Sequence, residues 1–236
     1  MSLRGWGIGL AAMLGTAGCA STPPVTYPQP TQGTPIAEPG PPPALPPRSP
    51  VLAEQGPYLP DAYLTICAGH VSNAPPRAAD GTVQYSPLIV VNNQVVLATV
   101  PTNNACLSSG FGRRYGQPHE GIDLKSRPPT MVFSGGPGII RRVASDNGYG
   151  LNVVIDHGSG VSTRYAHLSR VEPGIVEGAA IGFGQALGMM GQSGNATAIH
   201  VHYEVLVGQW GARGVWDLTP TNPFAWPAYD PGASVG

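Results

Sequence analysis

The chain has 236 residues, of which 42% are hydrophobic and only 11% are charged, and its formal net charge at pH 7 is −1. This balance excludes binding to nucleic acid, or to another anionic polymer, through a broad basic surface. Once the N-terminal segments described next are set aside, about 180 residues remain, enough for one domain with a hydrophobic core and an appendage.

Residues 1–18 have the features of a secretory signal peptide. Arg4 precedes an apolar stretch at residues 6–14, which is too short to cross a bilayer, and two small residues then lead to Cys19. This ending resembles a bacterial lipoprotein signal, although Thr16 stands where such signals usually have leucine. The resemblance implies lipidation of Cys19 and a membrane anchor. The alternative is an ordinary secretory signal with an incidental cysteine.

Residues 19–57 are predicted to be a tether. Twelve of the 27 prolines lie between residues 22 and 50, with almost no large apolar side chains, so this stretch cannot form a core. In polyproline II form, at about 3.1 Å per residue, it would reach up to roughly 100 Å. Ala20 is not an acidic retention residue, so the resemblance to diderm lipoproteins suggests the outer membrane, with the domain in the periplasm of the cell envelope.

Residues 58–105 are predicted to form a small β extension. The apolar runs at residues 88–91 and 95–97 are separated by Asn92 and Asn93, and asparagine tolerates positive φ, so the pattern predicts a β-hairpin. This extension lies N-terminal to the main domain. A flap over the functional site is the alternative, and the sequence does not decide between them.

The cysteine count suggests one disulfide. With Cys19 assigned to lipid, Cys67 and Cys106 remain as an even pair in an oxidising compartment. Their disulfide would close a loop of about 40 residues and stabilise the fold by roughly 4 kcal/mol on the chain-entropy estimate. Two buried thiols are the alternative.

Residues 106–228 predict an all-β domain, followed by a tail at residues 229–236. Strand-like runs alternate with glycine-rich turns, and no stretch shows sustained helical periodicity. The expected strands are residues 130–134, 139–144, 151–156, 161–167 and 199–207.

Four of the six histidines lie between residues 119 and 202, which suggests a metal centre. His200 and His202 stand two apart in an expected strand, so both imidazoles project from one face, with Cα atoms about 6.6 Å apart. One of them is suited to bind a metal while the other handles protons. Glu204 shares this face, either as a partner of a histidine or as the polar end of the face.

His119 and Asp123 are the other candidate ligands. In a straight strand they would lie about 13 Å apart, too far to share a metal with bonds of about 2.0–2.2 Å. The backbone must therefore turn near Gly121, which has no Cβ. A helix with Glu120 as the base is the alternative, but glycine and nearby prolines leave too little length for it.

Two imidazoles and one carboxylate form a set typical of catalytic zinc, because a fourth position stays open for water. Zinc lowers the pKa of bound water to about 7 and polarises a carbonyl, so amide hydrolysis is the natural reaction. His167 and the remaining histidine of the pair would serve as acid, base or oxyanion donor.

Five motifs follow one another between about residues 106 and 208: Ser109-Gly110-Phe111-Gly112-Arg113-Arg114, H-x-G-x-D at 119–123, Gly148-Tyr149-Gly150 with Ile155-Asp156-His157-Gly158, Tyr-x-His-Leu at 165–168, and H-x-H-x-E at 200–204. In this order they resemble peptidase family M23, the lysostaphin-like or LytM-type zinc endopeptidases of bacterial cell walls. By position, the resemblance implies that His119, Asp123 and His202 are the zinc ligands. It also implies that His167 and His200 are catalytic, in an antiparallel β fold with the metal in a groove.

The chain departs from the family pattern at three places. Residues 193–199 lack the Gly-Pro that often precedes the histidine at position 200, and the loop at residues 115–118 is short. Residues 135–138 stand where relatives often carry Ala-Asp-Gly. These differences affect the shape of the groove and substrate preference, not the metal.

The sequence thus predicts a lipid-anchored, Zn²⁺-dependent peptidoglycan endopeptidase that hydrolyses peptide cross-links of murein. The expected bond is the D-alanyl to meso-diaminopimelate cross-link. The alternative is a non-catalytic LytM-type regulator that binds and activates a cell-wall amidase, because some members of the family have lost ligands. Those members lack part of the five-residue set, which this chain keeps in full.

Overall fold

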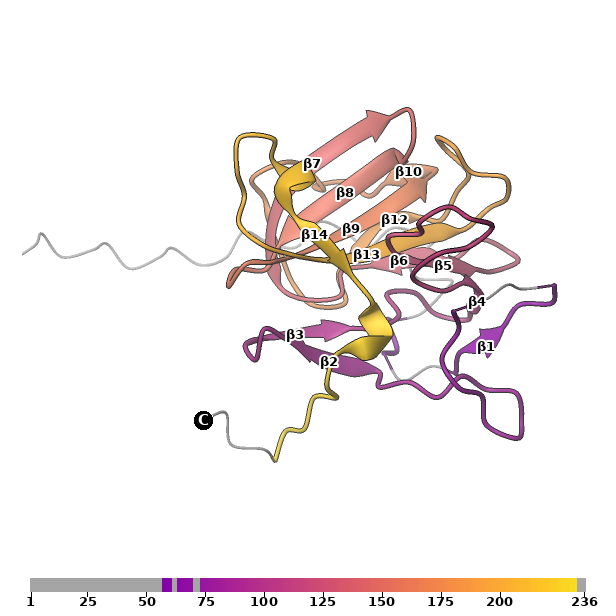
Figure 1. Ribbon diagram of the computed structural model, residues 1–236. Coiled ribbons are helices and arrows are strands. Elements are labelled where there is room, and N and C mark those ends of the chain that lie inside the picture. The colour runs from indigo at the N-terminus through magenta and orange to yellow at the C-terminus, as the bar shows by residue number, and fades with distance from the viewer. Residues whose placement is uncertain (1–56, 61–62, 70–72, 233–236) are drawn as a thin grey trace, which may run out of the picture. The chain divides into compact units, whose positions relative to one another are not determined.

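The structure is a computed structural model that describes residues 57–60, 63–69 and 73–232 (Figure 1). The expected signal peptide, Cys19 and the tether before residue 57 lie outside the described residues. The described part consists of strands and two short 3-10 helices, η1 (Val215–Asp217) and η2 (Pro223–Ala225), which confirms the predicted all-β fold. Within that part of the chain, no helix is long and apolar enough to span a membrane.

Nine strands form the main sheet. All of its pairings are antiparallel except that of its edge strands β1 and β4, which run parallel. Along the sheet the order is β1 (Thr65–Ile66), β4 (Cys106–Ser109), β5 (Ile122–Lys125), β13 (Val201–Val207), β9 (Val161–Leu168), β8 (Gly150–Asp156), β7 (Gly138–Asp146) and β11 (Ala180–Ile181), and β14 (Thr219–Thr221) also pairs with β13.

Two smaller sheets complete the fold. One contains β10 (Arg170–Val171), β12 (Ala186–Met189) and β6 (Met131–Phe133). The other is the predicted hairpin of β2 (Leu88–Val91) and β3 (Val95–Ala98). At its turn, Asn92 and Asn93 have φ values of 50° and 56°, the left-handed conformation that asparagine tolerates better than most residues.

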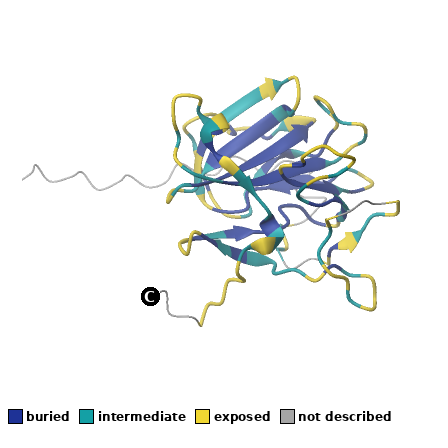
Figure 2. Cartoon of the chain, viewed as in Figure 1, coloured by how far each residue is buried: buried dark blue, intermediate teal, exposed yellow. Residues whose placement is uncertain are grey.

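The central strand β13 has one face in the hydrophobic core and one in a groove. Val201, Tyr203 and Val205 are fully buried in the core, and the buried residues of the central strands are visible in dark blue in Figure 2. His202 and Glu204 alternate with them and therefore project from the opposite face.

The β2–β3 hairpin packs on the core face of the main sheet. The hydroxyl of Tyr203 donates a hydrogen bond of 2.9 Å to the carbonyl of Ala98, at the end of β3, and Leu97 belongs to the same core cluster as Tyr203. No described residue between positions 57 and 105 lines the groove. The hairpin is therefore part of the core and does not cover the groove as a flap.

A disulfide joins Cys67 to Cys106, whose Cα atoms lie 5.0 Å apart. Cys106 is the first residue of β4, and Cys67 follows β1 directly, so the bond reinforces the parallel pair at the edge of the main sheet. The segment expected to be an extension thus contributes a strand to the main sheet as well as side chains to its core.

Candidate metal centre

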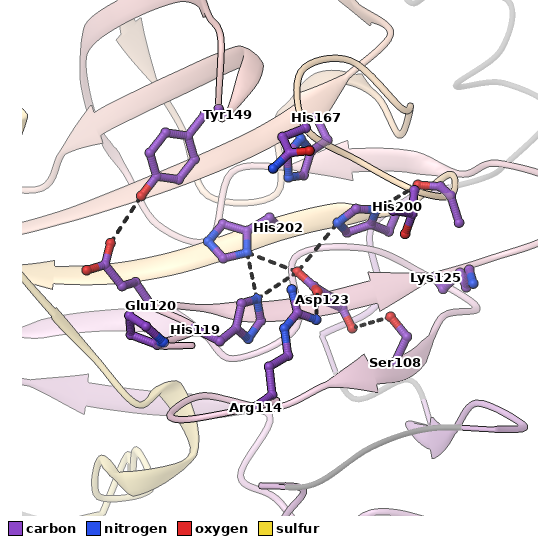
Figure 3. Close-up of a pocket in the computed structure, with 15 residues that line it drawn as sticks. Ser108, Arg114, His119, Glu120, Asp123, Lys125, Tyr149, His167, His200 and His202 are labelled. Atoms are coloured by element: carbon purple, nitrogen blue, oxygen red, sulfur yellow. Dashed lines mark hydrogen bonds and ion pairs between the residues drawn. The ribbon is translucent and has the colours of Figure 1, made fainter. Parts of the chain in front are cut away.

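A groove of about 680 Å³ lies on the face of the main sheet opposite the hairpin (Figure 3). Its floor is formed by side chains from β5 and β13, and its walls by the loops that precede or follow these strands and β8. All five residues that the sequence singles out line this groove or lie at its floor: His119, Asp123, His167, His200 and His202.

Three of these residues meet at one point. Asp123 Oδ1 lies 3.1 Å from His119 Nε2 and 2.9 Å from His202 Nδ1, and the two ring nitrogens are 3.0 Å apart. All three side chains are buried. Asp123 and His202 are direct partners in the antiparallel pairing of β5 with β13, which brings residues 79 positions apart into contact.

His119 is held by the chain on both sides of it. Its backbone exchanges two hydrogen bonds with Gly112, of 2.8 and 2.9 Å, so the short loop between them closes tightly. The sequence-based reason given for Gly121 is wrong, because its φ is not in the left-handed region. A Cβ there would lie 2.4 Å from the carbonyl oxygen of Tyr203 and 2.9 Å from the His202 ring, so glycine is required by close packing.

The hydrogen-bond partners of the two rings determine which nitrogens face each other. His119 Nδ1 lies 2.6 Å from the carbonyl of Gly110, and His202 Nε2 lies 3.0 Å from a carboxylate oxygen of Glu204, so both nitrogens are donors. The opposite nitrogen of each ring then carries a lone pair that points at the other and at Asp123. Three converging acceptors require a cation between them.

The spacing of these acceptors fits a small divalent metal. Tetrahedral ligands with bonds of about 2.0–2.1 Å lie roughly 3.3 Å apart, close to the distances of 2.9, 3.0 and 3.1 Å between the three atoms. Two imidazoles and one carboxylate also match the donor types that zinc prefers. The residues present therefore fit a zinc ion.

The electrostatics of the centre favour positive charge. Burial by itself would raise the pKa of Asp123, but hydrogen bonds from His119 and His202 outweigh it and hold the pKa well below its usual range. Burial would lower the pKa of His202, but Asp123 and Glu204 raise it to about 9. Without a metal the centre holds a proton at neutral pH, so a metal must displace that proton.

Glu204 and Arg164 form a buried ion pair behind His202. Their side chains approach to 2.8 Å, and Glu204 is fully inaccessible. Burial would raise the pKa of Glu204, but His202 and Arg164 lower it, so the carboxylate is charged. The Arg164 guanidinium lies 4.0 Å from the ring centroid of Tyr149 and 4.9 Å from that of Trp216, in the range of cation–π contacts. Glu204 is therefore a partner of His202 and not merely the polar end of a strand.

His167 and His200 lie next to each other, with ring centroids 4.7 Å apart. Nδ1 of His167 donates to the carbonyl of Ser193 and Nδ1 of His200 to that of Ala198, both at 2.8 Å, so each ring keeps Nε2 as an acceptor. Burial lowers the pKa of both rings, that of His167 to about 4, and both are neutral at pH 7. His200 Nε2 lies 3.6 Å from Asp123 Oδ1.

The backbone at His167 is unusual. Strand alternation would place His167 on the same face as Tyr165, which is buried in the core and accepts a hydrogen bond from the backbone of Gly135. His167 instead has a φ of 62°. This left-handed conformation, uncommon for a residue with a Cβ, turns the imidazole into the groove.

Sequence reasoning assigned no role to Arg114, Lys125 or Tyr149, which also line the groove. Arg114 binds Asp123 Oδ2 at 2.9 Å and so occupies the carboxylate oxygen that the two histidines leave free. The Tyr149 hydroxyl donates to Glu120 at 3.3 Å. Arg114 and Tyr149 belong to recognised motifs, but only the fold shows which way their side chains point.

Comparisons with known proteins agree with this geometry. Residues 117–213 match the sequence profile of peptidase family M23. Peptidoglycan DD-endopeptidase ShyA of Vibrio cholerae serotype O1 is 36% identical over 90 residues, which are 38% of this chain and 20% of that protein. DD-carboxypeptidase/endopeptidase Mpg of Neisseria meningitidis serogroup B is 38% identical over 89 residues, again 38% and 20%. The match thus spans about one fifth of the length of these curated relatives.

Among solved structures, the catalytic domain of a mutant of the prophage-encoded M23 protein EnpA from Enterococcus faecalis is similar, with 32% sequence identity and a TM-score of 0.44 over 51% of this chain and 89% of that chain. The five residues gathered in the groove all lie within the stretch that matches the family profile. Residues 117–213 of this chain therefore form a domain of peptidase family M23.

Proposed function

We propose that this chain is a zinc-dependent peptidoglycan endopeptidase that hydrolyses a peptide cross-link of murein. The observation that carries the proposal is the complete five-residue set in one groove, with His119, Asp123 and His202 converging and with His167 and His200 beside them. The similarity to a peptidoglycan DD-endopeptidase and to a DD-carboxypeptidase/endopeptidase supports peptidoglycan as the substrate.

The residues of the chain divide the work between metal and protons. His119, Asp123 and His202 would hold the zinc, which supplies Lewis-acid chemistry by polarising a carbonyl and making water acidic. His167 and His200 are neutral at pH 7 and present Nε2 to the groove, so either can accept a proton from the attacking water. The Nε2–H formed in this way can then be delivered to the leaving amine.

The metal assignment predicts different outcomes for the two kinds of histidine. Purified wild-type chain should contain about one zinc, and His202→Ala should lose it, because one of three ligands is removed. His167→Ala and His200→Ala should keep zinc but lose roughly 10²–10⁴-fold in turnover. Elemental analysis together with an assay on murein measures both. Full zinc occupancy in His202→Ala would overturn the ligand set.

Glu204 should set both the strength and the pH dependence of zinc binding. Because the raised pKa of His202, about 9, lets protons compete with the metal, zinc affinity should fall about tenfold per pH unit as pH drops below this value. Glu204→Gln removes one cause of the raised pKa, so the fall should begin at lower pH. The plateau affinity should be about 10- to 100-fold weaker, as for other partners of metal-binding histidines.

Competition with a chelator of known pH dependence measures these affinities. Glu172→Gln is the matched control, because Glu172 is also a buried carboxylate paired with an arginine, Arg170, at 3.1 Å, and it does not line the groove. It should leave the zinc curve unchanged. An unshifted onset in Glu204→Gln would show that Glu204 does not govern His202.

The proposed bond is the D-alanyl to meso-diaminopimelate cross-link. Digestion of murein by the purified protein should lower the amount of cross-linked muropeptide dimers and raise that of uncross-linked stem peptides, and a chelator should stop the reaction. Chromatography of the products decides the matter. Free glycan strands with intact cross-links, seen only when an amidase is added, would instead identify a non-catalytic regulator of that amidase.

We also propose that Cys19 is lipidated and anchors the chain to the outer membrane, on the grounds of the signal-like sequence before it. Wild-type protein should then sediment with outer-membrane fractions, whereas Cys19→Ser should be released, because no lipid is attached. Fractionation on a density gradient tests this. Firm membrane association of Cys19→Ser would place the anchor elsewhere.

A further inference from the structure

Lys125 is the only lysine in the chain, and it lines the groove. It stands two residues after Asp123 on β5, so strand alternation places both side chains on the same face. Their Cα atoms are about 6.6 Å apart, roughly two residues of an extended peptide lying parallel to the strand. The lysine is thus beside the metal centre but is not part of it.

Unlike the arginines of the site, Lys125 has no acidic partner. Arg114 is paired with Asp123 at 2.9 Å, and Arg164 with Glu204 at 2.8 Å. In the part of the chain that the structure describes, no carboxylate lies within ion-pair distance of Lys125. A half-buried ammonium without a partner, at the wall of a groove, is suited to bind an anionic group of a ligand.

The groove carries opposite charges on its two sides. Figure 3 shows Glu120 beside Tyr149 on one side of the three converging residues, and Lys125 on the side of Ser108. Glu120 is exposed and accepts a hydrogen bond from Tyr149 at 3.3 Å. A negatively charged group in the groove is therefore attracted towards Lys125 and repelled from the Glu120 side.

We propose that Lys125 forms a carboxylate-binding subsite, which holds a free carboxylate on the residue that supplies the scissile amide nitrogen. The reaction itself rests on the function proposed above, whereas the binding of a carboxylate by Lys125 can be tested without it. The proposed cross-link has such a group, because the carbon that bears the scissile nitrogen of diaminopimelate also bears a free carboxylate. A pentaglycine bridge has none at this position.

The first test measures binding alone. Reductive methylation with ¹³C-formaldehyde labels the one lysine, and the absence of its signal from Lys125→Arg assigns it. The label is introduced into full-length, zinc-loaded His167→Ala protein, which prevents turnover. N-acetyl-D-alanyl-D-alanine should shift the dimethyl-lysine signal, whereas its C-terminal amide should not. No shift with the acid, or equal shifts with both compounds, would overturn the subsite.

The second test measures selectivity in catalysis. Two cross-linked muropeptide dimers are compared, one with the free carboxylate beside the scissile nitrogen and one with this carboxylate amidated. For wild-type protein we expect kcat/KM to be roughly tenfold higher for the free acid, as one charge-assisted hydrogen bond provides. In Lys125→Gln the ratio should fall to about one, and in Lys125→Arg most of the preference should return.

Arg141→Gln is the matched control, because Arg141 is an exposed cation on β7 outside the groove, and its loss changes the net charge by the same amount. It should keep the wild-type ratio. An undiminished preference in Lys125→Gln would overturn the subsite while leaving the endopeptidase in place. If wild-type protein cleaved neither dimer, the proposed function would fail, and the binding experiment would decide on Lys125 by itself.

Discussion

The antiparallel pairing of β5 with β13 is the constraint on which the site depends. It sets Asp123 directly opposite His202, and the bond between them forces buried acceptors to within 3.1 Å of each other. Such an arrangement is repulsive unless a proton or a metal ion lies between the acceptors. The pairing on the other side of β13 sets Glu204 opposite Arg164, so the same strand also carries the carboxylate that orients His202. Metal binding is thus built into the hydrogen-bond register of the sheet.

The site is rigid because its strands also form the core. Tyr203 stands between His202 and Glu204, and its hydroxyl is anchored to the β2–β3 hairpin. A shift of register by one residue would exchange the two faces of β13, burying the charged pair in the core and exposing Tyr203. The stability of the fold and the geometry of the centre are therefore selected by the same alternation of side chains. The hairpin contributes to the site only through this support.

Strand positions and candidate ligands could be predicted from the sequence because both follow from local patterns. Alternation gave the shared face of His202 and Glu204, and motif spacing brought His119 and Asp123 into the same set. Three features could not be predicted. The left-handed backbone at His167 contradicts strand alternation, the close packing that requires Gly121 involves a strand some 80 residues away, and the ion pair of Arg164 depends on which strands are neighbours. Each is a property of tertiary contacts and leaves no local signal.

The disulfide lies closer to the functional groove than its position at the edge of the sheet suggests. Cys106 is the direct partner of Lys125 in the pairing of β4 with β5, and the next strand, β1, has only two residues with which to hold β4 from the other side. Without the covalent bond, β4 would be secured on that side by very few hydrogen bonds. An oxidising compartment is thus more than a favourable surrounding for this fold. It determines how firmly one wall of the groove is fastened to the rest of the molecule.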